Sequence, residues 1–241
     1  MIVTGGASGL GAAISIAFVQ EEAQVLVMDI SKPVRQESSG DPLEKPAYPE
    51  FLGDVTLPQD IEQCISKGIT LFGKIDILVN NAGVWPAAFV KDMPDEEWEQ
   101  TLRINLTSAF MFSKRIIRHL IETGRPGKII NIVSAAAFQG SATGHSHYAA
   151  AKAGLVAFTV TLAKEVACYG INVIAVAPGI MRTPMTEGAL HMREGNYLQR
   201  IPLGRLADPY EVANVVVFLA SEKANYITGA TIDVTGGLLM R

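Results

Sequence analysis

The sequence contains few cysteines and no long apolar run. Cys64 and Cys168 are the only two thiols in 241 residues. They are too few for a disulfide framework and lack metal-ligand spacing, so we expect reduced, packed thiols and no metal site. No apolar run approaches the ~20 residues that a membrane-spanning helix needs, and the N-terminus lacks the basic flank of a signal peptide. The sequence therefore predicts a cytoplasmic protein that does not bind membranes.

Charged residues are also scarce. They make up 18 % of the chain, and the net charge is -4. Nucleic acid and anionic membrane surfaces are therefore not expected as partners. Hydrophobic residues reach 49 %, which suggests that part of the surface is hidden in subunit contacts. A chain of this length can bury a large core, and we expect a single α/β domain over residues 1–241.

Predicted strands and helices alternate along the chain. Short apolar runs predict strands at 1–4, 24–29, 50–55, 75–79, 128–133, 171–177 and 231–234. Helical spacing or capping residues predict helices at 12–22, 59–72, 95–123, from 148 onward and at 208–219. The crossover rule then gives a Rossmann-type doubly wound α/β fold, with a parallel sheet flanked by helices. The stretch 31–49 contains four prolines and no apolar period, which favours an extended surface loop.

A glycine turn follows the first predicted strand. Gly5, Gly9 and Gly11 separate this strand from a helix. Glycines let the backbone approach a phosphate, and the helix N-terminus faces the anion. The spacing is not the commoner GxGxxG, and a glycine turn alone is structural about as often as it is functional.

An acidic residue closes the second predicted strand. In a dinucleotide fold, a carboxylate at the position of Asp29 accepts hydrogen bonds from the adenosine ribose and repels a ribose phosphate. Ser8, within the glycine turn, offers no basic side chain for such a phosphate. These residues favour NAD over NADP, and the alternative for Asp29 is a cap of the next turn. Asp54, after the third strand, suits either the adenine amino group or a helix cap.

Asn80, Asn81, Ala82 and Gly83 follow the fourth predicted strand. Two amides and a glycine at the carboxyl end of a parallel strand suit a wall beside a cofactor, where bulk would clash. Turn chemistry also uses asparagine and glycine, so this pattern by itself does not decide between the two.

Tyr148 and Lys152 lie four residues apart in an Ala-rich segment that predicts a helix. Their side chains share one face, so the ammonium can sit beside the phenol. A fixed positive charge favours the phenolate, and we expect it to lower the tyrosine pKa toward working pH. Ser134 ends the preceding strand, where its hydroxyl could hold a substrate oxygen. YxxxK alone is weak, because many Ala-rich helices carry this pair for structural reasons.

Two further segments stand out. Trp98, Leu102, Leu106 and Phe110 form a predicted packing stripe, and Asn105 lies one position off it, where a buried amide could hold a water. The segment 183–200 has no clean period but carries adaptable apolar residues, which suits an irregular lid over a pocket or a contact with another subunit.

Together these motifs resemble the classical short-chain dehydrogenases/reductases. The resemblance rests on TGGASGLG at 4–11, NNAG at 80–83, Asn105, Ser134, YAAAK at 148–152 and PGIMRT at 178–183. The motifs occur in family order, at family-like spacing, over nearly the whole chain. The resemblance implies a seven-stranded Rossmann domain, a nicotinamide cofactor, and hydride exchange with a ketone or secondary alcohol. The first strand is shorter than in relatives, so it is either truncated or begins upstream.

The resemblance also implies roles for individual residues. Tyr148 would be the general acid/base, Ser134 would orient the substrate oxygen, and Lys152 would depress the tyrosine pKa and hold the nicotinamide ribose. Asn105 would position a water that connects Lys152 to solvent, and Thr183 would bind the cofactor. The implied cofactor contacts are Gly5, Ser8, Gly9, Leu10, Gly11, Asp29, Ile30, Asp54, Val55, Asn81, Ala82, Gly83, Tyr148, Lys152, Pro178, Gly179, Ile180 and Thr183. The implied substrate contacts are Trp85, Phe138, His145, Met181 and Met185.

Three functions remain open at this point. The first is an NAD-dependent alcohol dehydrogenase or carbonyl reductase acting on a small or medium, largely apolar substrate. The second is a 3-oxoacyl-(acyl carrier protein) reductase, which 201–221 also resembles, although such enzymes usually prefer NADP. The third is an NAD-sensing binding protein without catalysis, against which the complete set of four catalytic residues argues. Family relatives tend to assemble as homotetramers through the two long helices, here 95–123 and 148–169.

Overall fold

The computed structural model describes residues 1–32 and 48–241, except for the side chains at 189, 192 and 193. Its centre is a seven-stranded parallel sheet in the order β3-β2-β1-β4-β5-β6-β7. The strands are β1 (Ile2–Thr4), β2 (Leu26–Asp29), β3 (Glu50–Leu52), β4 (Ile77–Asn80), β5 (Gly127–Ile132), β6 (Ile171–Pro178) and β7 (Thr231–Val234). This confirms the predicted Rossmann-type α/β fold and its parallel sheet. The predicted proline-rich loop falls largely on residues outside those described.

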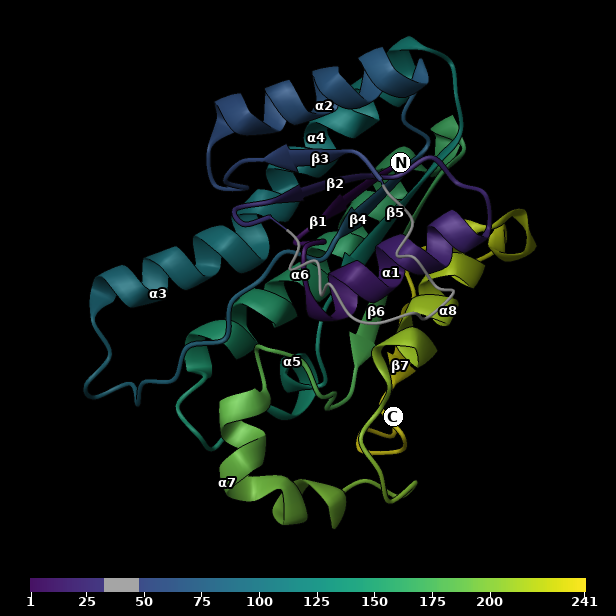
Figure 1. Cartoon of the computed structure of the whole chain (residues 1–241). Coiled ribbons are helices and arrows are strands. Elements are labelled where there is room, and N and C mark those ends of the chain that lie inside the picture. Colours follow the sequence, from purple (N-terminus) through teal and green to yellow (C-terminus); the bar gives the residue numbers. More distant parts are fainter. Residues whose placement is uncertain (33–47) are drawn as a thin grey trace, which may run out of the picture.

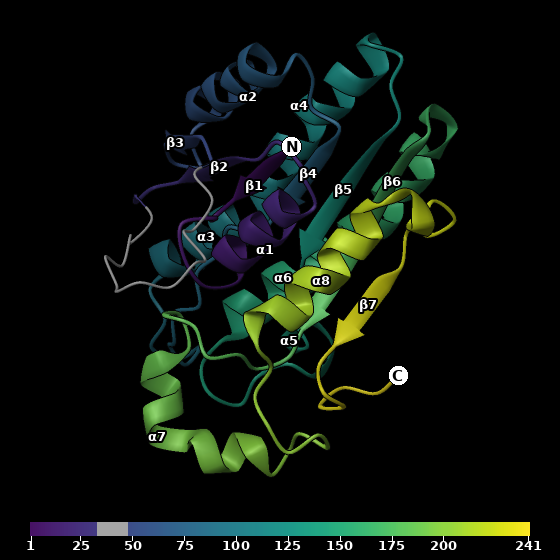
Figure 2. The same cartoon turned by 45° about the vertical axis from the view of Figure 1, so that its right-hand side comes forward.

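Helices cover both faces of the sheet (Figures 1 and 2). Alternate residues of β1 point to opposite faces: Val3 packs with α1 (Gly9–Gln20) and α8 (Pro209–Ala220), whereas Ile2 packs against the other helical layer. That layer consists of α2 (Pro58–Phe72), α4 (Ser108–Glu122) and α6 (Ser146–Val166). Because both faces are buried, the strands read as continuous apolar runs. None of the described helices is both long and apolar enough to cross a membrane.

Local sequence signals set several helix ends. At α8, Asp208 accepts a hydrogen bond from the backbone of Tyr210, and Glu211 closes a capping box. Pro209 occupies the first turn, where its missing N–H costs nothing. The predicted start of this helix at the Asp-Pro pair is therefore confirmed.

The long helical stretch from 95 to 122 is interrupted. α3 (Asp95–Leu102) leads into a π-helical turn (Arg103–Thr107) before α4 begins. This turn rotates the chain so that Asn105 is 1 % exposed, while Trp98 and Phe110 are 39 % and 46 % exposed. The predicted packing stripe is therefore only partly buried, and its ends form an apolar surface.

The segment 183–200 is mostly helical, which corrects the prediction of an irregular lid. After Thr183 and Thr186 form a hydrogen-bonded turn, α7 runs over Glu187–Leu198. Of the side chains described in this helix, only Leu190 is fully buried. One buried position gives no repeating apolar stripe, so the sequence concealed the helix. α7 lies at the carboxyl edge of the sheet, beyond the ends of the strands (Figure 1).

Among the described residues, two short helices were not predicted from the sequence. α5 (Ala136–Gln139) follows β5, and a 3₁₀ turn, Glu222–Ala224, precedes β7. A further 3₁₀ turn, Ala167–Tyr169, ends the helix predicted over 148–169. α5 packs against α6 and begins directly after Ser134, so it fixes the path of the chain between Ser134 and Tyr148.

Candidate active site

A cavity of about 900 Å³ opens at the carboxyl edge of the sheet. Its walls are the segments that directly follow β1, β2, β3, β4, β5 and β6, as expected for a ligand site in an open parallel sheet. The cavity volume lies in the range of roughly 300–1,000 Å³ typical of ligand pockets. Every residue predicted to contact the cofactor lines it, as do Asn105 and Ser134.

The glycine turn brings backbone to one end of this cavity. Gly5 has a φ of +63°, and a Cβ there would lie 2.7 Å from Ala82 Cα. A Cβ on Gly11 would lie 2.0 Å from the carbonyl oxygen of Gly5. Larger residues therefore cannot occupy these positions without moving backbone, and the N-terminus of α1 is left open to the cavity.

Asn81 ties the glycine turn to β4. Its amide nitrogen donates to the carbonyl oxygens of Thr4 (3.0 Å) and Gly5 (2.9 Å), while its own backbone N–H donates to Thr4 Oγ1 (3.1 Å). Asn80 points into the sheet instead and donates to Asn131 (2.8 Å) and Ser113 (3.2 Å). Only the second amide of the pair therefore serves the cavity.

Asp29 is held in place at the end of β2. Oδ2 accepts from the backbone N–H of Ala7 (3.0 Å), and Oδ1 accepts from the backbone and hydroxyl of Ser31 (3.1 and 3.2 Å). The carboxylate thus caps the next turn and lines the cavity, so the two sequence interpretations are compatible. Asp54 behaves similarly: it lines the cavity and accepts from Thr56 N (2.7 Å) before α2 begins.

Ser134, Tyr148 and Lys152 converge at the centre of the cavity. Ser134 follows β5, and its hydroxyl shares a hydrogen bond with Tyr148. Lys152 is 3 % exposed, and its Nζ lies 5.7 Å from the centroid of the Tyr148 ring and 2.8 Å from the Ile132 carbonyl oxygen. Among the described residues, no carboxylate forms an ion pair with this ammonium.

The pKa of Tyr148 shifts in the direction opposite to the sequence prediction. Burial raises the pKa of its phenol, and the hydrogen bond with Ser134 only partly opposes this shift. Burial also lowers the pKa of Lys152 to about 8. Burial thus disfavours the charged form of each group.

Asn105 lies near Lys152, and its side-chain oxygen has no hydrogen-bond partner among the described residues. Its Nδ2 donates to the carbonyl oxygens of Thr101 and Val84, both at 3.0 Å. Its Oδ1 is buried and has no hydrogen-bond partner among the described residues. A Cβ on Gly83 would lie 2.6 Å from this oxygen and 3.6 Å from Lys152 Nζ, so the absence of a side chain keeps the space between them open. A buried carbonyl oxygen needs a donor, which suits the predicted water.

The substrate predictions hold only in part. Trp85, Met181 and Met185 line the cavity. Phe138 does not, because its ring faces outward and is covered by the guanidinium of Arg241, 3.7 Å from the ring centroid. His145 is also absent from the wall: it is 5 % exposed and stacks on the far side of Trp85. Both corrections arise from contacts between distant segments, which spacing along the sequence does not reveal.

Several wall residues carry no sequence motif. The residues that sequence reasoning missed include Gln100, Ile104, Gln139, Asn196, Arg200 and Leu238. Leu190, Asn196 and Tyr197 of α7 line the cavity. The segment 183–200 therefore forms one wall of the pocket, in agreement with the prediction that it covers the pocket. Thr183 sits at its base, and a Cβ on Gly9 would contact the Thr183 Cβ at 3.3 Å.

Relatives of this chain are reductases named for acyl carrier protein substrates. Residues 5–239 match a family model described as enoyl-(acyl carrier protein) reductase. The chain is 39 % identical over 243 residues to the 3-oxoacyl-(acyl-carrier-protein) reductase of Thermotoga maritima, covering 99 % of this chain and 97 % of that protein. The enzyme of the same name from Escherichia coli is also 39 % identical, over 247 residues covering 99 % of this chain and 96 % of that protein.

Two solved structures of short-chain dehydrogenases are also similar to this chain. A short chain dehydrogenase from Bacillus anthracis has a TM-score of 0.88 and 35 % identity, covering 100 % of this chain and 96 % of that one. A short-chain type dehydrogenase/reductase from Mycobacterium marinum has a TM-score of 0.91 and 30 % identity, covering 100 % and 95 %. The chain belongs to the short-chain dehydrogenase/reductase family. It is therefore an oxidoreductase of a family that uses a nicotinamide cofactor, as the sequence motifs predicted.

The site of this short-chain dehydrogenase/reductase fits a nicotinamide dinucleotide. The glycine turn leaves room for a pyrophosphate at the N-terminus of α1, and Asp29 offers acceptor oxygens at the far end of the same wall. Lys152 lies at the other end, beside Tyr148. Among the described residues, no group of three or more His, Cys, Asp or Glu side chains is placed to hold a metal ion.

Proposed function

We propose that this protein reduces the 3-oxo group of an acyl thioester to a 3-hydroxyl group, with NADH as the preferred hydride donor. The observation that carries the proposal is the placement of Tyr148, Ser134 and Lys152 together in a cavity that the glycine turn and Asp29 also line. The names of the relatives supply the substrate class.

Each polar group has a distinct task in this reaction. Ser134 donates a hydrogen bond to the ketone oxygen and holds it beside Tyr148. Tyr148 donates its phenolic proton to that oxygen as the carbonyl carbon receives the hydride that the bound cofactor supplies, which gives a secondary alcohol. Lys152 stabilises the phenolate that remains. Asn105 Oδ1 would hold a water through which a proton returns to Tyr148.

The raised pKa of Tyr148 suits a general acid, which must hold its proton before the reaction. Tyr148 would accept the same proton in the reverse oxidation.

The preference for NADH rests on Asp29. Its carboxylate is fixed by three hydrogen bonds at the end of β2 and lines the cavity. A phosphate on the adenosine ribose would bring two negative charges together there. Ser8, the exposed residue in the adjoining glycine turn, carries no positive charge to offset them.

A second candidate is an NAD-dependent dehydrogenase or carbonyl reductase for a small secondary alcohol. Asp29 favours it, because an NAD preference suits oxidation as well as reduction. The two candidates share their catalytic residues and differ in the group attached to the carbonyl carbon chain.

The deciding experiment measures nicotinamide absorbance with both cofactors over acetoacetyl thioester, simple ketones and secondary alcohols. The proposal expects NADH-dependent reduction of the thioester with the highest kcat/KM of the panel. Turnover of simple alcohols or ketones without the thioester would support the second candidate instead. Absence of turnover with every substrate would contradict both.

We further propose that the protein assembles as a homotetramer through the helical stretch 95–122 and α6. Trp98 and Phe110 are exposed on the first, and Val160 is 36 % exposed on the second. Apolar side chains gathered on long helices favour burial between subunits. Light scattering on the purified protein tests this proposal: the mass of four chains is expected, and a monomer would contradict it.

A further inference from the structure

A second cavity adjoins the candidate active site. It has a volume of about 570 Å³ and lies between the loop after β4 and the helical wall made by α3 and the π-helical turn that follows it, with Met185 of the segment before α7 also in its lining. Both cavities share six lining residues: Gly83, Val84, Trp85, Gln100, Ile104 and Met185. Because Gly83 lies beside Asn105 and Lys152, the second cavity begins next to the reacting groups.

Stacking holds one wall of this second cavity in place. The rings of Trp85 and His145 lie 4.2 Å apart between centroids, at an interplanar angle of 19°. His145 Nδ1 is 2.7 Å from the carbonyl oxygen of Pro86, which also lines the cavity. Two residues after Pro86, the backbone N–H of Ala88 donates a hydrogen bond to the carbonyl oxygen of Gly144 at 2.8 Å. The loop after β4 is therefore fixed to the segment before α6, and the aromatic wall is preorganised.

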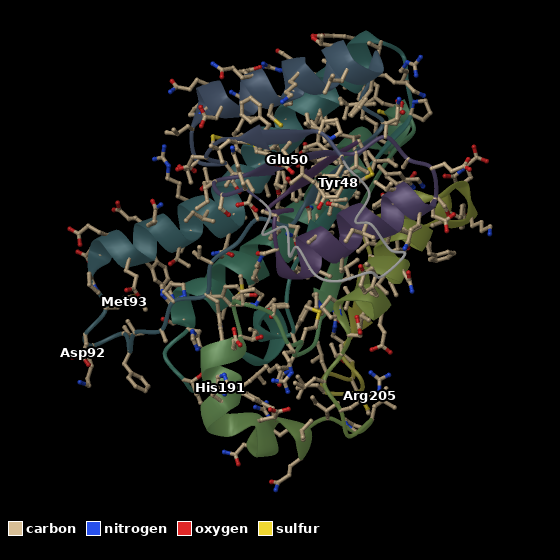
Figure 3. The ribbon with its side chains drawn as sticks, viewed as in Figure 1. Tyr48, Glu50, Asp92, Met93, His191 and Arg205 are labelled. Atoms are coloured by element: carbon tan, nitrogen blue, oxygen red, sulfur yellow. The ribbon has the colours of Figure 1, made fainter. Side chains whose placement is uncertain are left out.

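The α3 side is fixed as well. Glu97 lines the second cavity, and its carboxylate lies 3.1 Å from Nε2 of His147, whose side chain is fully buried. This contact joins α3 to the residue that precedes Tyr148. Figure 3 shows the loop before α3, marked by Asp92 and Met93, and α7, marked by His191, at the same edge of the molecule.

The two directions out of the reaction centre differ in polarity. Most of the second cavity is walled by apolar side chains, namely Val84, Trp85, Pro86, Ile104 and Met185. The rim of the main cavity on the α5 and α7 side carries Gln139, Asn196 and Arg200, with Arg200 Nη2 3.5 Å from Gln139 Oε1. An elongated substrate with one polar and one apolar end would therefore lie in a single orientation.

We propose that the second cavity is a subsite for the apolar acyl tail of the substrate, while the polar thioester arm leaves past the α5 and α7 rim. The inference rests on the proposed function for the identity of the substrate. Each methylene of the tail that this apolar lining removes from water should raise the affinity for the substrate about fourfold. The rigid Trp85 wall provides that gain without the cost of ordering a loop.

The test compares chain lengths in a pair of matched variants. Gln100→Phe places a ring across both cavities from an exposed position on α3, and Glu99→Phe adds the same ring at an exposed neighbour that lines neither cavity. We expect wild type to prefer 3-oxodecanoyl over acetoacetyl thioester in kcat/KM. Gln100→Phe should lower this preference about tenfold or more, and Glu99→Phe should leave it within about twofold. An unchanged preference in Gln100→Phe would overturn the subsite.

A binding measurement separates this inference from the proposed function. Trp85 and Trp98 are the two tryptophans of the chain, so Trp98→Phe leaves Trp85 as the single indole reporter. Titration of Trp98→Phe with 3-hydroxydecanoyl thioester should then change the fluorescence of Trp85 in a saturable way. The double variant that carries both Trp98→Phe and Gln100→Phe should show no such change. If no thioester is reduced, the proposed function fails, and this titration still decides the subsite. A fluorescence response that persists with Gln100→Phe, or never appears, would contradict it.

Discussion

The two ends of the active-site cavity are built differently. The cofactor end follows directly from the ends of parallel strands, where Gly5, Asp29 and Asn81 each continue a buried run. The substrate end is made by loops and by α7, which meet only through contacts such as Trp85 on His145. The comparison teaches that a sheet edge fixes the positions of chemical groups, whereas the shape of the substrate pocket depends on how loops pack.

The same difference explains what the sequence could predict. The residues carried by strand ends, and the Tyr148 and Lys152 pair on one helix face, all line the cavity because their positions follow from local periodicity. Phe138 and His145 were assigned to the substrate pocket by family resemblance, and the structure places neither in the wall of the cavity. The π-helical turn that buries Asn105 has no sequence signal either.

The pKa of Tyr148 illustrates a second limit. A lysine four residues away is visible in the sequence, and its charge favours a low pKa. The degree of burial is not visible, and in this protein desolvation raises the pKa of the phenol. The sign of such a shift depends on two opposing effects, and only the structure reveals the larger one.

Among changes that compare the two ends of the cavity, the largest effect is expected from Gly11→Ala, which tests the rigidity of the cofactor end. The added Cβ would lie 2.0 Å from the carbonyl oxygen of Gly5, so backbone must move. Overpacking of this kind costs about 1–3 kcal/mol in the free energy of unfolding. We expect that loss in urea denaturation, together with at least about tenfold weaker NADH binding in a fluorescence titration. Binding equal to wild type would show that the glycine turn does not hold the cofactor.

An intermediate effect is expected at Asp29. In Asp29→Asn the negative charge is removed at nearly unchanged size, and one of the two accepting oxygens becomes a donor NH2 group. The ratio of kcat/KM with NADH to that with NADPH should fall about tenfold, because repulsion of the ribose phosphate is lost. Asp233→Asn is a matched control, since Asp233 pairs with Arg241 and does not line the cavity. An unchanged ratio in Asp29→Asn would remove Asp29 as the selector.

The smallest effect is expected at the substrate end, from Gly188→Ala in α7. A Cβ there meets no atom within 4 Å, in contrast to Gly11. Alanine restricts the unfolded chain and favours helix, so the free energy of unfolding should rise by about 0.4–1 kcal/mol. Urea denaturation measures this directly. A loss of stability would mean that α7 packs more tightly than its open surroundings indicate.

The most direct test of the account is Tyr148→Phe, with turnover and NADH binding measured on the same preparation. Removing the phenolic proton should lower kcat for thioester reduction by about 10²–10⁴-fold while the dissociation constant for NADH stays within about twofold. Tyr226→Phe, at a fully exposed phenol, provides the matched control and should behave as wild type. Full reductase activity in Tyr148→Phe would contradict the central claim that Tyr148 supplies the proton.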